Sequence, residues 1–189
     1  MHAYTHTHTH TCVCVYVCAR ACVCVCVCVC VCVCRRKFGG RGTLSNWWTD
    51  GDARRFTEKA RCIENFYSSF SFFGHHVNGA LTLGEDIADM GGVKVSYKAL
   101  QALTQEQAAD TSRHGGLSDK ERRLFFLAWG QNWCVVERQR AAELQLFTDE
   151  HAPNKLRVNG PLMNFQPFAT AYGCPTGSYM APKEKCQLW

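Results

Sequence analysis

Apolar residues recur at helical spacing over much of the chain, and the first clear pattern begins near Asp50. Its apolar positions lie three or four residues apart, as one buried face of a helix requires. These positions are Phe56, Ala60, Ile63 and Tyr67. We predict a helix here. The Asn78-Gly79 pair that follows stands between apolar residues, a composition typical of a hairpin or tight turn.

Two longer helices are predicted downstream of that turn. One should begin near Thr82 and run to about Ala102, where the polar sequence TQEQAADTSRHGG indicates an exposed loop or a loose helix end. Ser118 and Glu121 have the spacing of a capping box and should open the next helix. Its stretch LFFLAWGQNWCVV is apolar on nearly every side, which predicts that this helix is buried.

Two shorter helices complete the prediction of a mainly α-helical domain. They cover residues 138–146 and about 165–172. Between them, Pro153 and the Asn159-Gly160 pair should interrupt helical structure.

The first 34 residues follow a two-residue repeat. Thr-His alternates up to Thr11, and Cys then alternates with Val through Cys34, which accounts for ten of the 14 cysteines. At the codon level, alternating ACAC encodes Thr-His and its complement encodes Cys-Val. We therefore interpret residues 1–37 as an unstructured low-complexity segment translated from a dinucleotide microsatellite.

Three other interpretations of the repeat stay open. Residues 12–34 are long enough to span a bilayer, although Arg20 near the middle would cost about 2.5–3.5 kcal/mol on insertion scales. Alternating Val also suits a β-strand. Finally, the Thr-His tract could bind a metal ion.

Composition and charge narrow the classes of function. The chain has 189 residues, enough for one domain with a hydrophobic core, and a formal net charge of +5. Basic residues are spread along the chain apart from residues 35–37, and they do not interleave with aromatic residues. Nucleic acid is therefore a poor candidate partner.

The role of Glu85, as a helix cap or as a metal ligand, is the main chemical question. It follows Thr82 at the spacing of a capping box, so it could simply close the first turn of a helix. Asp89 lies four residues further on, and both carboxylates should share one helix face, where they repel. A bound cation would remove that repulsion. Gly91-Gly92 within the same predicted helix indicates close approach of another element.

Several separated motifs resemble one family. VNGALTLGEDIADMGGVKVSYKAL resembles a characteristic segment of the neprilysin and endothelin-converting-enzyme family of zinc metallopeptidases. The stretches WWTDGDARRFTEKARCIENFYSSF, LFFLAWGQNWC and TDEHAPNKLRVNG and the ending CQLW resemble its other motifs, in the same order. The resemblance covers residues 38–189. It implies the C-terminal part of a zincin-like catalytic domain that acts on small peptides.

The resemblance also implies roles for five residues. Glu85 matches the glutamate that binds the catalytic Zn²⁺, and Asp89 matches the aspartate that orients a histidine ligand. His151 matches the histidine that stabilises the oxyanion, and Asp149 the acidic residue that helps to orient it. Arg157 matches the arginine that hydrogen-bonds the substrate.

The four cysteines outside the repeat fit the same family. Cys62 and Cys186 match a pair that forms a disulfide, whereas Cys134 and Cys174 match positions whose partners lie outside this chain and are expected to be free or mispaired. The resemblance implies an enzyme at the plasma membrane, facing the extracellular side. The membrane anchor of such enzymes is not evident in this sequence.

The sequence departs from the family at a decisive place. The family's HExxH motif, which supplies two histidine ligands and the general base, is absent from all 189 residues. The Cys-Val repeat stands where that motif would lie. We therefore expect the chain to be inactive as written. Asp86 replaces the family's usual asparagine, a small change. The alternatives are a non-catalytic binding module and a membrane-anchored decoy.

Overall fold

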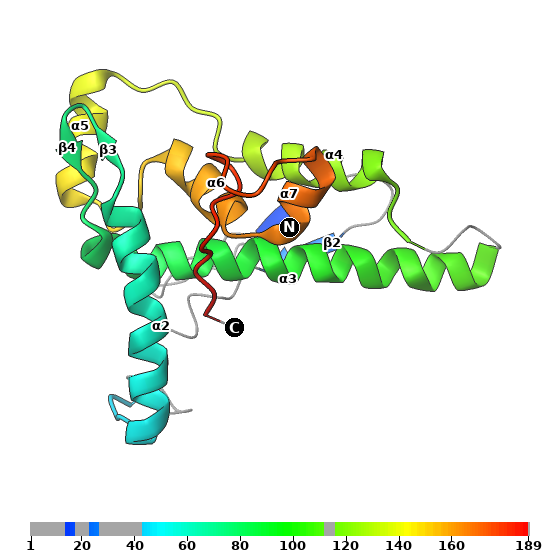
Figure 1. Ribbon diagram of the computed structural model, residues 1–189, viewed down its shortest axis with the longest axis horizontal. Coiled ribbons are helices and arrows are strands. Elements are labelled where there is room, and N and C mark those ends of the chain that lie inside the picture. The colour runs from blue at the N-terminus through cyan, green and yellow to red at the C-terminus, as the bar shows by residue number, and fades with distance from the viewer. Residues whose placement is uncertain (1–13, 18–22, 27–42, 112–115, 189) are drawn as a thin grey trace, which may run out of the picture.

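The computed structural model describes residues 14–17, 23–26, 43–111 and 116–188. It is mainly helical (Figure 1). The helices are α2 (Asp50–Ser68), α3 (Gly79–Thr111), α4 (Asp119–Gln131), α5 (Gln139–Thr148), α6 (Asn154–Met163) and α7 (Gln166–Tyr172). Strands β1 (Cys14–Val17) and β2 (Val23–Cys26) pair antiparallel, and β3 (Ser71–Phe72) and β4 (His75–His76) form a short hairpin. None of the helices so described is long and apolar enough to cross a membrane.

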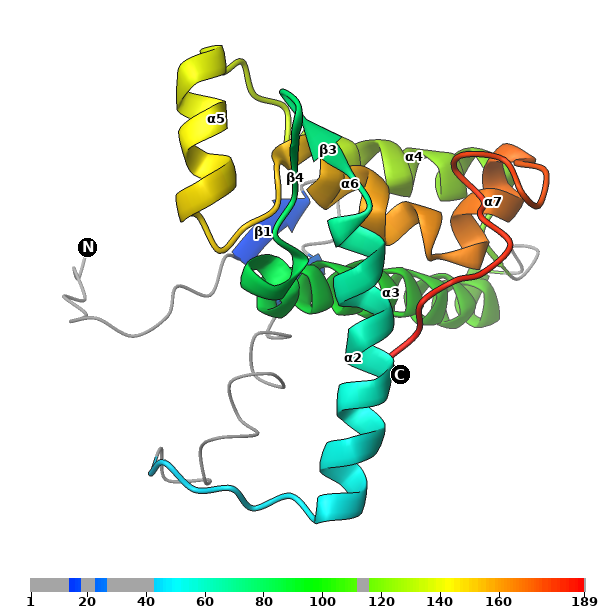
Figure 2. The same cartoon turned by 60° about the vertical axis from the view of Figure 1, so that its left-hand side comes forward.

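The long helix α3 is the element around which the others are arranged. Helix α2 crosses it near its N-terminal end, and α4, α6 and α7 lie along one side of it (Figures 1 and 2). The prediction for α2 is confirmed: Ala60, Ile63 and Tyr67 are buried, and the Thr49 hydroxyl caps the helix by accepting from the backbone N–H of Asp52.

The Asn-Gly pair does not form the hairpin turn. The β3–β4 turn is made by Phe73 and Gly74, whereas Asn78 opens α3 by accepting a hydrogen bond from the backbone N–H of Leu81 (3.1 Å). Gly79 fits there because a Cβ would collide with the carbonyl oxygen of Glu64 on α2. Close approach of two helices, and not turn geometry, requires this glycine.

The capping-box interpretation of Glu85 is therefore wrong. Because α3 begins at Gly79, Glu85 lies in its second turn. The Thr82 N–H is already bonded to the Asn78 carbonyl oxygen, and the Thr82 hydroxyl donates to Asp86 (2.7 Å). The side chain of Glu85 instead lies near His151 and Arg157. Helix α3 also continues beyond the predicted end near residue 102, as far as Thr111. Gly91 and Gly92 are both buried within it.

The predicted start of α4 is confirmed, but the prediction that this helix is buried is wrong. Ser118 and Glu121 form the expected capping box. Phe126 is buried and stacks on Tyr97 of α3, with ring centroids 5.4 Å apart. The side chains of Leu124 and Leu127, on another face, are 59% and 55% exposed, and residues 132–138 are not helical. Only one face of this apolar helix finds a partner among the elements that the structure describes.

The shorter helices α5 and α7 agree with the prediction, but α6 does not. Pro153 precedes α6 as expected, yet the helix then runs through Asn159, Gly160 and Pro161 to Met163. At Gly160 a Cβ would collide with the hydroxyl of Tyr67 on α2. The packing of α6 against α2 therefore overrides the local preference of Asn-Gly for a turn.

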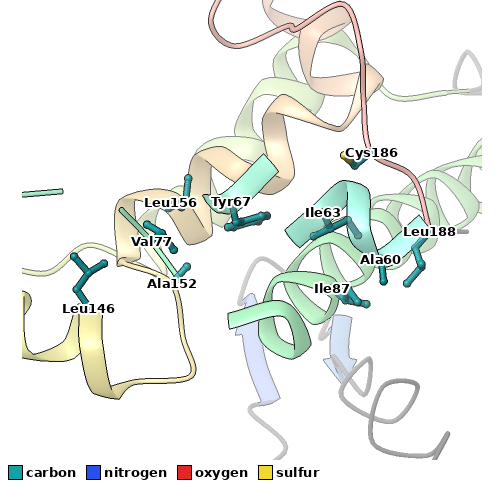
Figure 3. Close-up of a cluster of buried hydrophobic side chains, with 10 residues drawn as sticks. All are labelled: Ala60, Ile63, Tyr67, Val77, Ile87, Leu146, Ala152, Leu156, Cys186 and Leu188. Carbon is teal, nitrogen blue, oxygen red and sulfur yellow. The ribbon is translucent and has the colours of Figure 1, made fainter. Parts of the chain in front are cut away.

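The core joins the C-terminal segment to α2 and α3. Figure 3 shows Cys186 and Leu188 beside Ile63 and Ala60 of α2, with Ile87 of α3 below them. A disulfide links Cys62 to Cys186 across 124 residues, with Cα atoms 5.6 Å apart, as the family resemblance implied. The two remaining cysteines outside the repeat, Cys134 and Cys174, are free thiols.

The repeat interpretations fall mostly outside the described residues. Of residues 1–37, only β1 and β2 are described, as two antiparallel strands. The microsatellite, membrane-span and His-tract interpretations remain predictions.

Candidate active site

The structure brings together the five residues that the sequence singled out. Glu85 and Asp89 lie one turn apart on α3, and Arg157 reaches them from α6. Asp149 and His151 come from the loop between α5 and α6. Residues separated by more than 60 positions thus form one cluster, because α6 packs along the first turns of α3.

His151 lies between two carboxylates. Its Nδ1 is 2.8 Å from Asp149 Oδ1, and its Nε2 is 3.4 Å from Glu85 Oε2. The backbone N–H of His151 also donates to Asp149 Oδ1 (2.9 Å), so this carboxylate fixes both the ring and the loop. An imidazole that carries protons on both nitrogens can donate to both neighbours. Asp149 thus binds Nδ1 of the ring, and Nε2 faces Glu85.

Arg157 is held in place from two directions. Its Nε and Nη2 donate to the two oxygens of Asp89 at 2.7 and 2.9 Å, which is a bidentate pair. The guanidinium also lies over the ring of Trp133, 3.9 Å from the ring centroid, and 4.0 Å from Glu85 Oε2. The roles assigned to Asp89 and Arg157 remain predictions, and in this structure the two side chains bind each other.

Trp133 is the site residue that sequence reasoning missed. It lies just after α4, in a stretch whose apolar pattern predicts a buried helix. The stretch resembles a family motif, but no local spacing pairs Trp133 with Arg157. The packing of the α4 end against α6 creates this contact, so the sequence contained no independent signal for it.

Burial raises the pKa values of the acidic groups, whereas hydrogen bonds lower them. Burial raises the pKa of Asp89, and the hydrogen bonds and charge of Arg157 oppose that rise. Asp149 is more exposed. Burial would raise its pKa too, but the hydrogen bonds from the backbone and ring of His151 outweigh it and hold the pKa below the usual value. Asp149 therefore stays ionised to a lower pH than an ordinary aspartate.

Asp86 lies directly behind this cluster and differs from the other carboxylates. Its side chain is 1% exposed; Oδ2 accepts from the Thr82 hydroxyl, whereas Oδ1 has no hydrogen-bond partner. Burial raises its pKa to about 8, against the opposing hydrogen bond from Thr82. Aspartate at this position, where the resemblance implies asparagine, therefore has a larger physical effect than the sequence suggested.

The residues present do not by themselves fit a zinc ion. Over the described part of the chain, no three His, Cys, Asp or Glu side chains are placed so that they could hold a metal ion together. Glu85 supplies one carboxylate, and the nearby His151 ring is bonded to Asp149. A catalytic zinc site takes three protein ligands and an open position. The further ligands would have to come from outside the cluster.

Comparisons with known proteins agree with the motifs. The model of a family described as peptidase family M13 matches residues 34–188. Endothelin-converting enzyme-like 1 of Rattus norvegicus is 43% identical over 148 residues, 78% of this chain and 19% of that protein. Endothelin-converting enzyme 1 of Cavia porcellus is 38% identical over 155 residues, 82% of this chain and 20% of that protein.

Solved structures show the same similarity. The zinc metalloprotease ZMP1 of Mycobacterium tuberculosis, in complex with an inhibitor, matches with a TM-score of 0.67 and 26% identity, over 80% of this chain and 24% of that one. The chain spans about a fifth of the length of the curated relatives that it matches.

Proposed function

The chain belongs to peptidase family M13, and from this premise we propose that it is the C-terminal part of the catalytic domain of a zinc-dependent metalloendopeptidase that hydrolyses small peptides. The observation that carries the proposal is the contact between Glu85 and the His151–Asp149 pair. Glu85 lies far from Asp149 and His151 in the sequence, so the packing of the fold brings these groups together. Three polar groups with matched family roles meet at one place.

Each residue of the cluster has a defined task in this proposal. Glu85 would supply one carboxylate ligand to a zinc ion, and the further ligands would come from outside the cluster. His151 donates a hydrogen bond to the oxyanion that develops on the peptide carbonyl, and Asp149 keeps the ring in the orientation that this requires. Asp89 is proposed to orient a histidine ligand and Arg157 to hydrogen-bond the substrate, and their bidentate pair braces the α3–α6 contact beside Glu85.

The chain alone is proposed to be inactive, because HExxH is absent from its sequence and its described residues form no metal cluster. We place the parent enzyme at the plasma membrane, facing outward. The Cys62–Cys186 disulfide supports this location, since disulfides persist in oxidising surroundings outside the cytosol.

A chimaera tests the proposal. Residues 43–188 of this chain would replace the matching segment of Cavia porcellus endothelin-converting enzyme 1, which is 38% identical to the chain. Bound zinc is measured by atomic emission, and cleavage of a fluorogenic peptide is measured with and without a chelator. We expect zinc binding and chelator-sensitive cleavage. In His151→Gln, we expect zinc to be retained and kcat to fall by about 10²–10³-fold.

Glu85→Gln should lose both zinc and activity, whereas Glu58→Gln, which changes an exposed carboxylate on α2, should lose neither. A Glu85→Gln chimaera that still holds zinc would refute the assigned ligand. Chelator-sensitive cleavage by the unmodified chain would refute its inactivity.

A further inference from the structure

A cavity of about 170 Å³ lies beside His151, on the side of the cluster away from α3. It opens between the tip of the β3–β4 hairpin, α5 and the start of α6; Figure 2 shows the hairpin beside α5. Leu146 and Ala152, both buried, form an apolar part of its wall, and Phe73 stands at the hairpin side. The proposed catalytic roles use His151 but leave this space unassigned.

The charged side chains around the cavity favour a cationic ligand. The two basic groups that line it are already paired with carboxylates: Arg157 with Asp89, and His151 with Asp149. Glu137 adds a further carboxylate to the wall, where Oε1 accepts from the amide of Asn154 at 3.3 Å. A cation entering here would meet a carboxylate whose partner is a neutral amide.

The hairpin that borders the cavity is held in an unusual conformation. Phe73 has φ = 54°, the left-handed region that a bulky side chain rarely adopts, at a cost of about 1–3 kcal/mol. It is the single non-glycine residue with positive φ within the described ranges. An edge-to-face contact between the rings of His75 and Phe147, 5.0 Å apart, attaches the hairpin to α5. This geometry keeps an aromatic ring at the cavity edge, with 48% of Phe73 exposed.

Resting on the proposed peptidase function, we propose that this cavity is a subsite for a lysine or arginine side chain of the peptide substrate. The aliphatic stem lies against Leu146 and Ala152, and the charged head reaches Glu137. Because His151 lies at the cavity edge, a peptide whose carbonyl oxygen meets that ring places a neighbouring side chain at the opening. Phe73 covers the stem from the hairpin side.

Peptide binding to the refolded chain tests the subsite without requiring catalysis. Three seven-residue peptides of alanine and glycine, with lysine, norleucine or glutamate at the centre, are titrated by isothermal calorimetry. We expect the lysine peptide to bind about three- to five-fold more tightly than the norleucine peptide, as an exposed ion pair allows. The glutamate peptide should bind most weakly. The preference should shrink in about 0.5 M salt, which screens exposed charges.

Two variants separate this contact from general electrostatics. Glu137→Gln should bring the lysine-to-norleucine ratio close to one, whereas Glu150→Gln, which removes an exposed carboxylate that does not line the cavity, should preserve it. Equal binding of lysine and norleucine, or an equal effect of both variants, overturns the subsite alone. If none of the peptides binds to a chain that is folded by circular dichroism, the subsite is overturned as well, whereas the proposed function stands or falls with zinc binding and cleavage by the chimaera.

Discussion

Replacing Asp86 by asparagine should stabilise the chain, and should do so only above acidic pH. The carboxyl is 1% exposed, one of its oxygens has no partner, and its folded-state pKa is about 8 against a reference value of 3.8. The folded state therefore holds the proton more tightly than the unfolded state. Stability from this group is complete below about pH 4 and is lost as the pH rises toward 8.

The size of the effect follows from that difference in pKa. Each pH unit between the unfolded and folded pKa values costs about 1.4 kcal/mol, so the cost at pH 7 is on the order of 4 kcal/mol. Asparagine has nearly the same shape, does not titrate, and can still accept the hydrogen bond of the Thr82 hydroxyl. Structural relaxation and water entry lower the cost, and we take about 2 kcal/mol as the smallest effect that fits the argument.

Urea unfolding, followed by circular dichroism from pH 4.5 to 8.5, provides the assay. The free energy of unfolding of the wild-type chain should fall with rising pH relative to Asp86→Asn, and the difference should shrink to about 1 kcal/mol or less at pH 4.5. Glu58→Gln serves as the control, because this exposed carboxylate lies in the middle of α2. A constant difference between wild type and Asp86→Asn at all pH values, or a destabilised variant at pH 8, would refute the reasoning.

Three further predictions concern packing, the disulfide and the buried ion pair. Gly160→Ala should destabilise the chain by about 1–3 kcal/mol in thermal melts, because its Cβ meets the α2 tyrosine hydroxyl, whereas Gly130→Ala, where a Cβ has room, should not. Cys62→Ser should cost about 4–5 kcal/mol, as expected for a loop of this length, and an unchanged urea midpoint would contradict that. Arg157→Met should cost about 3–5 kcal/mol by leaving Asp89 unpaired, and adding Asp89→Asn should restore part of the loss; additive losses would show that the two side chains do not interact.

The sequence by itself predicted several of the local elements and singled out the residues of the cluster. The apolar spacing in α2 and the capping box at Ser118 depend on residues within a turn or two of each other, so they could be read directly. The separated family motifs singled out Glu85, His151 and Asp149, and the structure brings these side chains together although Glu85 lies far from the other two along the chain.

Only the tertiary structure decided which partners meet and which faces are buried. Asn78-Gly79 begins a helix and Gly160 lies within one, because α2 approaches both glycines too closely for any side chain. The contact of Arg157 with Trp133 and the exposure of one face of α4 depend on which helix faces meet. So does the raised pKa of Asp86, because desolvation is set by every neighbouring element at once and no local spacing encodes it.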